Sequence, residues 1–264
     1  MKLRKPVFAI LMLALVLALA CGCGAQSPQK RTLNLGFDAE FPPYGYMGED
    51  GEYTGFDIDM AKALCERLDW ELKLVPISWD SRDMELESGT IDCIWNGFTI
   101  NGREEQYTWT DAYMDNSQVF VVRSDSGIVS FSDLAGKIVA VQTESSAQAA
   151  LEAEENAELL ASFSKLEKVG DYNTAFMKLE SGAADAIAMD AGVARFQTEG
   201  REDAFMLLDE ALVAEKYGIG FLLGNTELRD EVQAELMKMA EDGAFAEISN
   251  KWFGYDVCIL GAAS

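Results

Sequence analysis

One segment of eleven residues occurs twice in this chain. Residues 84–94 and 177–187 are identical at seven of eleven positions without a gap, and the two copies begin 93 residues apart. In each copy a helix is expected to end at a Ser-Gly pair, where glycine adopts the left-handed conformation that closes helices, and an acidic residue and a short apolar strand follow. Two such units predict two similar α/β lobes facing one cleft, although helix–turn–strand units can also resemble each other by chance.

The remaining sequence alternates between short apolar runs and amphipathic segments. The expected strands cover residues 33–37, 72–76, 119–122, 137–141, 205–208 and 217–223, and the expected helices cover residues 56–68, 146–155, 191–198, 227–241 and 244–252. This alternation predicts an α/β fold with mainly parallel sheets. Open parallel sheets bind ligands at the carboxyl ends of their strands, so the polar residues that follow the two repeated strands are candidates for a site.

The loop after the first expected strand combines acids, prolines and aromatic rings. Residues 38–44 read Asp-Ala-Glu-Phe-Pro-Pro-Tyr, and the two prolines restrict the backbone. Phe41 and Tyr44 beside Asp38 would form an aromatic wall with a carboxylate, which suits a small zwitterion or a cation. A packed surface loop is the alternative interpretation.

Polar groups also follow the first repeated strand, at Asn96, Gly97 and Thr99. Glycine lets the backbone approach a ligand closely, and Thr99 supplies a hydroxyl group. Arg103, a little further on, can bind a carboxylate with two parallel hydrogen bonds. Because two glutamates follow Arg103 directly, a solvated ion pair explains this arginine equally well.

The second expected lobe offers a helix start and an acid. Residues 142–146 lie between a strand and a helix, where free backbone N–H groups attract anions. Ser146 is there a candidate ligand contact, and serine is also an ordinary N-cap residue. Asp190 ends the second repeated strand, where it would receive an ammonium group or cap the next helix.

Together these groups match the chemistry of a free amino acid. Arg103 and the helix start at Ser146 would bind the carboxylate, and Asp190 would bind the ammonium group. Asp38 is left for the side chain of the ligand. The stem of the ligand would pack against three aromatic residues: Phe41, Tyr44 and Trp79.

The composition excludes several classes of function. A net charge of −24 repels nucleic acids and anionic lipid headgroups. The chain contains no histidine, which removes the Ser-His and Cys-His nucleophile systems and the commonest zinc ligand. We therefore expect no catalytic residues, no metal site and no cofactor.

Three cysteines lie in the body of the chain: Cys65, Cys93 and Cys258. An odd number leaves at least one unpaired. Buried thiols are the favoured interpretation, and a bridge between Cys65 and Cys258 stays open.

The N-terminus is typical of an export signal. Three basic residues precede fourteen apolar residues at 7–20, a run too short for a resident membrane helix and of the right length for a signal peptide. A small residue directly before a cysteine resembles a bacterial lipobox, which would make Cys21, or alternatively Cys23, the lipidated N-terminus of the mature protein. We expect a signal peptide over residues 1–20 and a lipidated polar tether over residues 21–31, with an ordinary cleaved signal as the alternative.

Six stretches of the chain carry a resemblance to a known family. They are Phe-Asp-Ala-Glu-Phe-Pro-Pro-Tyr at 37–44, Gly-Phe-Asp-Ile-Asp-Met-Ala at 55–61, Asn-Gly-Phe-Thr-Ile at 96–100, Thr-Asp-Ala-Tyr at 110–113, Val-Ala-Val-Gln at 139–142 and Ala-Met-Asp at 188–190. In their order and spacing they resemble the polar amino-acid family of extracellular solute-binding proteins that serve ABC importers, over about residues 32–255.

The chain departs from the family pattern at two places. The family commonly reads Thr-Ile-Thr-Pro-Glu-Arg where this sequence reads Thr-Ile-Asn-Gly-Arg, one residue shorter, so Arg103 is aligned by its chemistry. Ala147 stands where many members carry a polar contact to the ligand.

The resemblance implies a two-lobed α/β fold, the type II periplasmic-binding-protein-like fold, with a hinge of two crossover strands and a ligand cleft between the lobes. Lobe 1 would comprise residues 32–117 and 216–258, lobe 2 residues 118–215, and residues 259–264 would form a C-terminal tail. The helix start at 55–59 has a structural role in the family. With Tyr44 added from the residue-level argument, the expected ligand contacts are Asp38, Phe41, Tyr44, Trp79, Asn96, Gly97, Thr99, Arg103, Ser146 and Asp190.

The resemblance also implies a mechanism and partners. A ligand that bridges both lobes favours the closed form, and the membrane subunits of an ABC importer would recognise that form. We expect a monomer anchored by lipid to the outer face of the bacterial cell membrane, without enzymatic activity. A secreted dehydratase or lyase on the same scaffold, or a sensor that acts through a membrane receptor, are the alternatives, and basic and neutral polar amino acids are equally expected as ligands.

Overall fold

The computed structural model describes residues 30–261. Residues 1–31 and 32–264 form separate units, and the helices and strands of the described residues all belong to the second unit. The predicted signal peptide and the lipidation sites Cys21 and Cys23 lie outside the described residues. Within residues 30–261, no helix combines the length and the apolar character that crossing a membrane requires.

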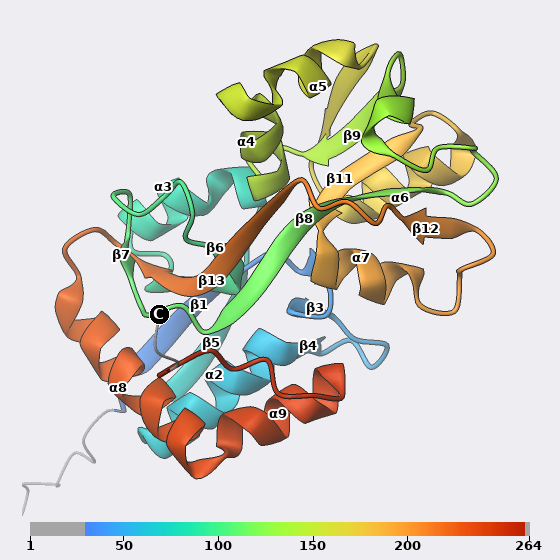
Figure 1. The fold of residues 1–264 in the computed structure, drawn as a ribbon. Coiled ribbons are helices and arrows are strands. Elements are labelled where there is room, and N and C mark those ends of the chain that lie inside the picture. Colours follow the sequence, from blue (N-terminus) through green and yellow to red (C-terminus); the bar gives the residue numbers. More distant parts are fainter. Residues whose placement is uncertain (1–29, 262–264) are drawn as a thin grey trace, which may run out of the picture. The chain divides into compact units, whose positions relative to one another are not determined.

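A ten-stranded sheet forms the centre of the molecule (Figure 1). Eight of its strands lie side by side in the order β10 (Lys165–Val169), β9 (Ile138–Gln142), β11 (Ala186–Asp190), β8 (Met114–Arg123), β13 (Val213–Phe221), β6 (Cys93–Thr99), β1 (Thr32–Phe37) and β5 (Glu71–Pro76). Two further strands pair at the side, β12 (Phe205–Leu207) with β8 and β7 (Thr108–Trp109) with β13. A second, small sheet contains β2 (Glu40–Phe41), β3 (Gly45–Met47) and β4 (Tyr53–Thr54).

The direction of the strands corrects one expectation. β5, β1 and β6 are parallel to each other, as are β10, β9 and β11. The centre of the sheet is antiparallel, because β8 pairs antiparallel with β11 and with β13, and β13 pairs antiparallel with β6. The prediction of mainly parallel sheets is therefore wrong for the middle, where the long strands β8 and β13 run side by side from one half of the sheet to the other (Figure 1).

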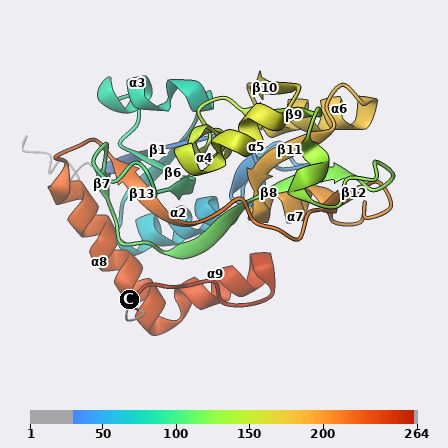
Figure 2. The same cartoon turned by 45° about the horizontal axis from the view of Figure 1, so that its top comes forward.

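Most helices begin and end close to where the sequence predicts them, whereas α4 ends three residues early and α5 was not predicted. They are α2 (Phe56–Arg67), α3 (Arg82–Glu87), α4 (Ser146–Glu152), α5 (Ala157–Ser162), α6 (Tyr172–Ser181), α7 (Ala191–Thr198), α8 (Thr226–Asp242) and α9 (Ala244–Phe253), with short 3₁₀ turns η1 (Trp79–Ser81), η2 (Phe131–Leu134) and η3 (Glu154–Asn156). Figure 2 shows α8 and α9 together on the side of the first half of the sheet, and α5, α6 and α7 around the second half.

The repeated segment forms the same structure in both copies. The helices α3 and α6 are followed by Gly89 and Gly182, whose φ angles are 73° and 76°. The acid that comes next fastens the strand: Asp92 Oδ2 accepts a hydrogen bond from the backbone N of Asn34 (2.7 Å), and Asp185 Oδ2 accepts one from the backbone N of Ile138 (2.9 Å). The internal repeat is thus a repeat of structure.

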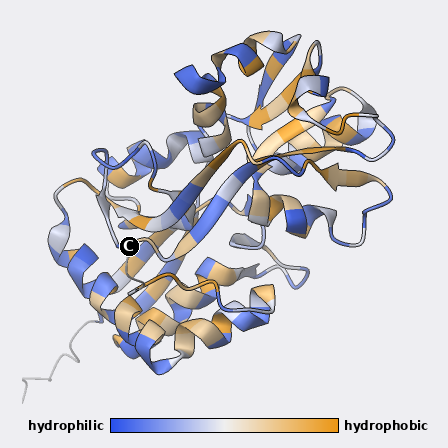
Figure 3. Ribbon diagram, in the orientation of Figure 1, coloured by the Kyte–Doolittle hydropathy of each residue, from blue (hydrophilic) through white to orange (hydrophobic). Residues whose placement is uncertain are grey.

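Apolar side chains form separate clusters as well as a shared core. One buried cluster contains only residues between Phe120 and Leu208, and another only residues between Leu86 and Tyr107. The apolar strands of the second half stand out in Figure 3, whereas β8 changes from hydrophilic over its first residues to apolar over its last. Cys65 and Cys93 are buried, Cys258 is half-buried, and all three are free thiols, so the bridge between Cys65 and Cys258 is not formed.

Candidate functional site

Four strands direct their carboxyl ends towards one place. Asp38 follows β1, Thr99 ends β6, Gln142 ends β9 and Asp190 ends β11. All four residues are buried. Asp38 and Gln142 are in contact, since Gln142 Nε2 donates a hydrogen bond of 2.7 Å to Asp38 Oδ2. The predicted meeting of the two halves at their strand ends is therefore present in the geometry.

Asp38 is an acid held in the interior. Its Oδ1 accepts a hydrogen bond from the backbone N of Glu40 at 2.9 Å, in addition to the bond from Gln142. Burial raises the pKa of Asp38 to about 6, and the two hydrogen bonds offset part of that effect. At neutral pH this carboxylate is charged and has no positively charged hydrogen-bond donor among the described residues.

The aromatic wall of the first loop exists and contains a ring that the sequence did not indicate. Phe41 packs against Tyr44 and Tyr172, with ring centroids 5.7 Å and 6.0 Å apart. Tyr44 and Tyr172 are fully buried, and neither hydroxyl group has a hydrogen-bonding partner of acceptable geometry among the described residues. Burial raises the pKa of both phenols well above the usual value. Tyr172 is the first residue of α6.

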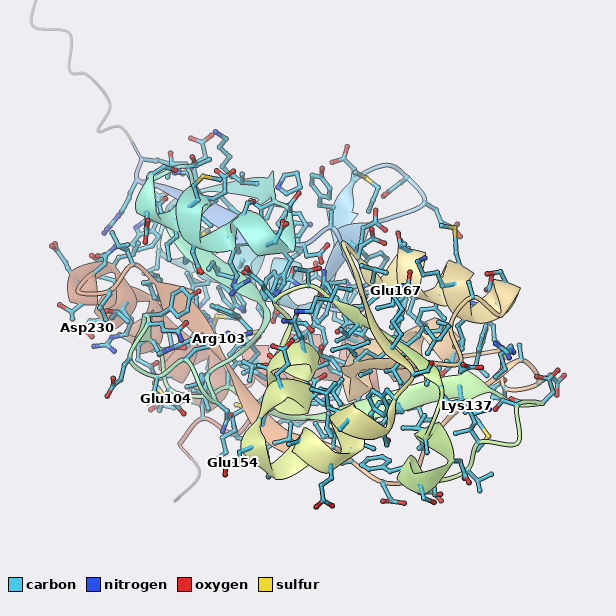
Figure 4. The ribbon with its side chains drawn as sticks, turned by 90° about the horizontal axis from the view of Figure 1, so that it is seen from above. Arg103, Glu104, Lys137, Glu154, Glu167 and Asp230 are labelled. Atoms are coloured by element: carbon cyan, nitrogen blue, oxygen red, sulfur yellow. The ribbon has the colours of Figure 1, made fainter. Side chains whose placement is uncertain are left out.

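Arg103 is buried rather than solvated. Its side chain is 8% exposed and donates to three uncharged oxygens: Ser146 Oγ (2.9 Å), the Glu144 backbone oxygen (3.2 Å) and the Thr99 backbone oxygen (3.3 Å). Among the described residues no carboxylate lies within ion-pair distance of it. Figure 4 labels Arg103 and its exposed neighbour Glu104. Burial, followed by the nearby charge of Arg82, lowers the pKa of Arg103.

Trp79 lies apart from the aromatic wall. Its ring meets the edge of Phe98 at 5.4 Å, and the guanidinium of Arg82 lies 5.1 Å from it. The guanidinium of Arg103 lies 5.4 Å from the same Phe98 ring. Trp79 and Arg103 thus both lie against the Phe98 ring.

The end of β6 is shaped by a buried acid. The backbone N of Gly97, whose φ is 55°, donates a hydrogen bond of 2.6 Å to Asp57 Oδ2. Tyr113 also donates to Asp57, and burial raises the pKa of Asp57 to about 7. Asp57 therefore positions the β6 end from inside the fold, in agreement with its expected structural role. Asn96 and Thr99 on either side of Gly97 have buried side-chain atoms without partners.

Asp190 receives hydrogen bonds from three uncharged side chains. Asn116 Nδ2 and Gln118 Nε2 each donate to Asp190 Oδ1 at 2.9 Å, and the Tyr217 hydroxyl donates to the same oxygen at 2.6 Å. Asp190 makes no side-chain cap on α7, so the capping alternative does not describe it. Burial raises the pKa of Asp190, and the bonds from Tyr217 and Gln118 lower it.

The sequence did not identify Asn116, Gln118, Tyr217 or Glu215, all of which line this acid or its surroundings. The signal that could have found the first two is the alternation on β8: two amides, at positions 116 and 118, face one side of a strand that is otherwise apolar towards its end.

Unpartnered polar atoms concentrate around these residues. Buried side-chain atoms without a partner among the described residues belong to Tyr44, Arg82, Trp95, Asn96, Thr99, Gln118 and Tyr172. Five of these seven surround Phe41, Tyr217 or Asp190. Buried polar groups in folded proteins are normally hydrogen-bonded, so these atoms are available to form hydrogen bonds with a polar ligand.

A cavity of about 620 Å³ lies beside this cluster. Its lining includes Tyr44, Asn116, Gly192, Trp252 and Phe253, and Tyr44 is the one predicted site residue among its lining residues. We regard the buried charges, rather than this open cavity, as the chemical centre. Within residues 30–261 no group of three Cys, Asp or Glu side chains is arranged to hold a metal ion.

Comparisons with known proteins agree with this geometry. Residues 33–255 match the model of the family described as bacterial extracellular solute-binding proteins, family 3. The L-cystine-binding protein TcyJ of Escherichia coli (strain K12) is 29% identical over 232 residues, which are 87% of this chain and 85% of that protein.

Solved structures are similar over most of the chain. The substrate-binding protein of an ABC uptake transporter from Streptococcus pneumoniae, with bound histidine, is 33% identical with a TM-score of 0.82, over 86% of this chain and 94% of that one. An ancestral arginine-binding protein bound to arginine is 35% identical with a TM-score of 0.78, over 85% of this chain and 99% of that one.

Proposed function

Because the chain belongs to family 3 of the bacterial extracellular solute-binding proteins, we propose that it binds a free polar amino acid between two lobes and delivers it to an ABC-type importer. The relatives named above bind cystine, histidine and arginine. They support an amino acid with a polar side chain as the ligand of this protein.

The observation that carries the proposal is a pair of buried, opposite charges without charged partners among the described residues. Arg103 donates only to uncharged oxygens, and Asp190 accepts only from uncharged donors. A buried charge is costly unless it is paired. The carboxylate and the ammonium group of an amino acid are the two partners that would complete Arg103 and Asp190.

The remaining predicted residues have consistent roles in this proposal. Asp38 receives a polar side chain of the ligand, and Phe41 and Tyr44 pack against its stem. The unpartnered atoms of Asn96 and Thr99 supply hydrogen bonds at the end of β6. Ser146 orients Arg103, and Trp79 covers the arginine side of the cleft.

We take residues 32–117 with 216–258 as lobe 1, residues 118–215 as lobe 2, and β8 and β13 as the hinge. The separate apolar clusters in the two halves support this division. Phe41 packs against Tyr172 across the boundary between the halves, and hydrogen bonds across it join Asp38 with Gln142 and Arg103 with Ser146. Polar contacts of this kind can open and reform, so binding would stabilise the closed form by bridging the halves.

A thermal-shift screen tests the proposal directly. Protein without residues 1–31 is tested with the twenty standard amino acids and L-cystine, and hits are measured by titration calorimetry. A ligand present at one hundred times its dissociation constant stabilises the folded state by about 2.7 kcal/mol. Folded protein that responds to none of these compounds would refute an amino-acid ligand.

The proposal includes export and a lipid anchor, which rest on residues outside the described part. The protein would be a monomer held at the outer face of the membrane through Cys21 or Cys23. Mass spectrometry of the N-terminal peptide from a membrane fraction distinguishes a diacylglyceryl-modified Cys21, a modified Cys23 and an unmodified, cleaved chain. The last result would remove the anchor from the proposal and leave the binding function intact.

A further inference from the structure

Glu215 is a buried acid on the crossing strand β13. Its side chain is 4% exposed, whereas its neighbours Ala214 and Lys216 are exposed. It therefore faces the interior at the centre of the molecule. None of the sequence patterns that predict the site includes it.

The pairing of three strands brings Glu215 to Asp190. β8 lies between β11 and β13, with Asp190 opposite Gln118 on one side and Glu215 opposite Asn116 on the other. Positions 116 and 118 face the same side of β8. The two acids thus flank two amide side chains.

Both acids use the same donors. Asn116 Nδ2 donates to Asp190 Oδ1 (2.9 Å) and to Glu215 Oε1 (2.6 Å), and Gln118 Nε2 donates to the same two oxygens at 2.9 Å and 2.7 Å. An amide nitrogen carries two hydrogens, so each amide gives both of its hydrogens to this pair. The two carboxyl groups are held side by side by a bridge that carries no charge.

Two carboxylates so close together and so deeply buried do not both ionise without a cation. Burial, followed by the charge of Asp190, raises the pKa of Glu215 to about 8. The groups that face the pair from neighbouring elements are the phenols of Tyr44, Tyr172 and Tyr217 and the guanidinium of Arg103. The phenols are neutral at pH 7 and Arg103 is bonded to other groups, so the pair keeps one proton. We place it on Glu215, because Asp190 accepts an additional hydrogen bond from the Tyr217 hydroxyl.

We propose that Asp190 and Glu215 together form the ammonium subsite, and that Glu215 releases its proton to the solvent when the ammonium group of the ligand binds. This inference rests on the proposed function. Before binding, the pair holds one carboxylate and one carboxylic acid. After binding, it holds two carboxylates beside one ammonium group, and the proton from Glu215 has passed to the buffer.

The consequence is an affinity that depends on pH in a defined direction. Release of one proton strengthens binding about tenfold per pH unit while Glu215 is protonated in the free protein. We expect this slope between pH 6 and about 7.5 and a plateau above the pKa of Glu215. Glu215→Gln keeps a neutral side chain of the same shape and should bind with an affinity that does not change over this range.

Calorimetry in two buffers counts the protons. L-arginine, or the amino acid with the largest shift in the screen, is titrated at pH 7.0 in phosphate and in Tris, which have different ionisation enthalpies. Wild-type protein should release close to one proton per ligand bound, and Glu215→Gln should release close to none. Glu235→Gln is the control, since Glu235 is also a buried acid but lies on α8 in ion pairs with Arg67 and Lys238, outside the proposed site, and it should release as many protons as the wild type.

The outcomes separate this inference from the proposed function. No binding of any amino acid refutes the proposed function. Binding without proton release by the wild type overturns the inference alone, as does equal release by Glu215→Gln, which would assign the proton to another group such as Asp57. If Glu215→Gln does not fold, the wild-type protein alone tests the inference. The number of protons that it releases per ligand must then fall as the pH rises, with a midpoint near the pKa of Glu215.

Discussion

The two halves of the sheet share one plan and differ in the groups at its polar end. β1 lies between β5 and β6 in the first half, and β9 lies between β10 and β11 in the second, with all three strands parallel in each. The acids Asp92 and Asp185 bind the backbone of Asn34 and Ile138 at equivalent positions. Because these two positions correspond, residues at equal distances from them along the chain can be compared between the halves.

In this register the polar ends of the halves are complementary. Four residues beyond Asn34 stands Asp38, and four residues beyond Ile138 stands Gln142. These equivalent residues bind each other across the halves. Gly97 and Asp190 are equivalent in the same way, each five residues beyond the anchoring acid. The repeat thus builds two similar structural units whose matched positions carry different polar groups, an acid against an amide at 38 and 142 and a glycine against an acid at 97 and 190.

The largest effect we expect comes from removing the charge that distinguishes each half. Arg103→Ala and Asp190→Ala should each weaken binding of the screened amino acid at least about 30-fold, or about 2 kcal/mol, because the ligand then buries an unpaired charge. Titration calorimetry measures the affinities. Glu104→Ala, at the exposed neighbour of Arg103, should bind as the wild type does, and unchanged affinity in both test variants would place the ligand elsewhere.

The second prediction tests the equivalence of the two anchoring acids. Asp92→Ala should lower the free energy of unfolding by about 2 kcal/mol and Asp185→Ala by about 1.5 kcal/mol, because each leaves a backbone N–H without its charged acceptor. Asp92 should cost more, since it also accepts a bond from the Asn34 side chain at 2.8 Å. Urea unfolding measures both, with Asp203→Ala at an exposed turn as the control. A loss of unfolding free energy in only one of the two variants would show that the two acids do not contribute equivalently to stability.

A third prediction concerns the contact between Asp38 and Gln142. The folded-state pKa of Asp38 is about 6, above the ordinary value of 3.8, so the folded protein binds more protons than the unfolded chain between these values. Stability contributed by the protonated form is present at low pH and declines as pH rises from about 4 to 6. Gln142→Ala removes a hydrogen bond that lowers this pKa.

We expect Gln142→Ala to extend the decline upwards by about one pH unit, equivalent to about 1.4 kcal/mol. Chemical unfolding between pH 4 and 8 measures it. Asp38→Asn, in the same assay, should lack this part of the profile altogether. Superimposable profiles for wild type and Gln142→Ala would mean that the contact between the halves does not form in solution.

Local sequence patterns predicted the positions of most helices and strands. The helix α2 ends one residue from its expected end, and the strands β1, β5 and β9 begin within one residue of their expected starts. Their apolar periodicity is strong, and Gly89 and Gly182 terminate the repeated helices by local backbone chemistry. Such signals depend on neighbours in sequence, so they can be detected without knowing the fold.

The partners of the charged groups could not be predicted in the same way. Glu215 followed by Lys216 is typical of an exposed ion pair, and its burial arises only because β13 lies antiparallel beside β8. The three donors to Asp190 lie 72, 74 and 27 residues away in the chain. Tyr172 and Gln142 reach the site from the second half for the same reason. Register between distant strands decides these contacts, and the family pattern contains only part of it.

The smallest expected effect tests the frame where the two halves are most alike. Gly89 and Gly182 have nearly equal positive φ angles, and a Cβ added at either would meet no atom within 4 Å. Gly89→Ala and Gly182→Ala should therefore each lower the free energy of unfolding by about 1 kcal/mol, from backbone conformation alone. Gly170→Ala is the matched control, because its position is equally open and its φ lies outside the left-handed region, so alanine should be neutral or slightly stabilising. Equal losses of unfolding free energy at Gly89 and Gly182 would show that the two repeated turns contribute equally to stability. A loss at only one of them would show that the two copies share the sequence of the turn but not its contribution to stability.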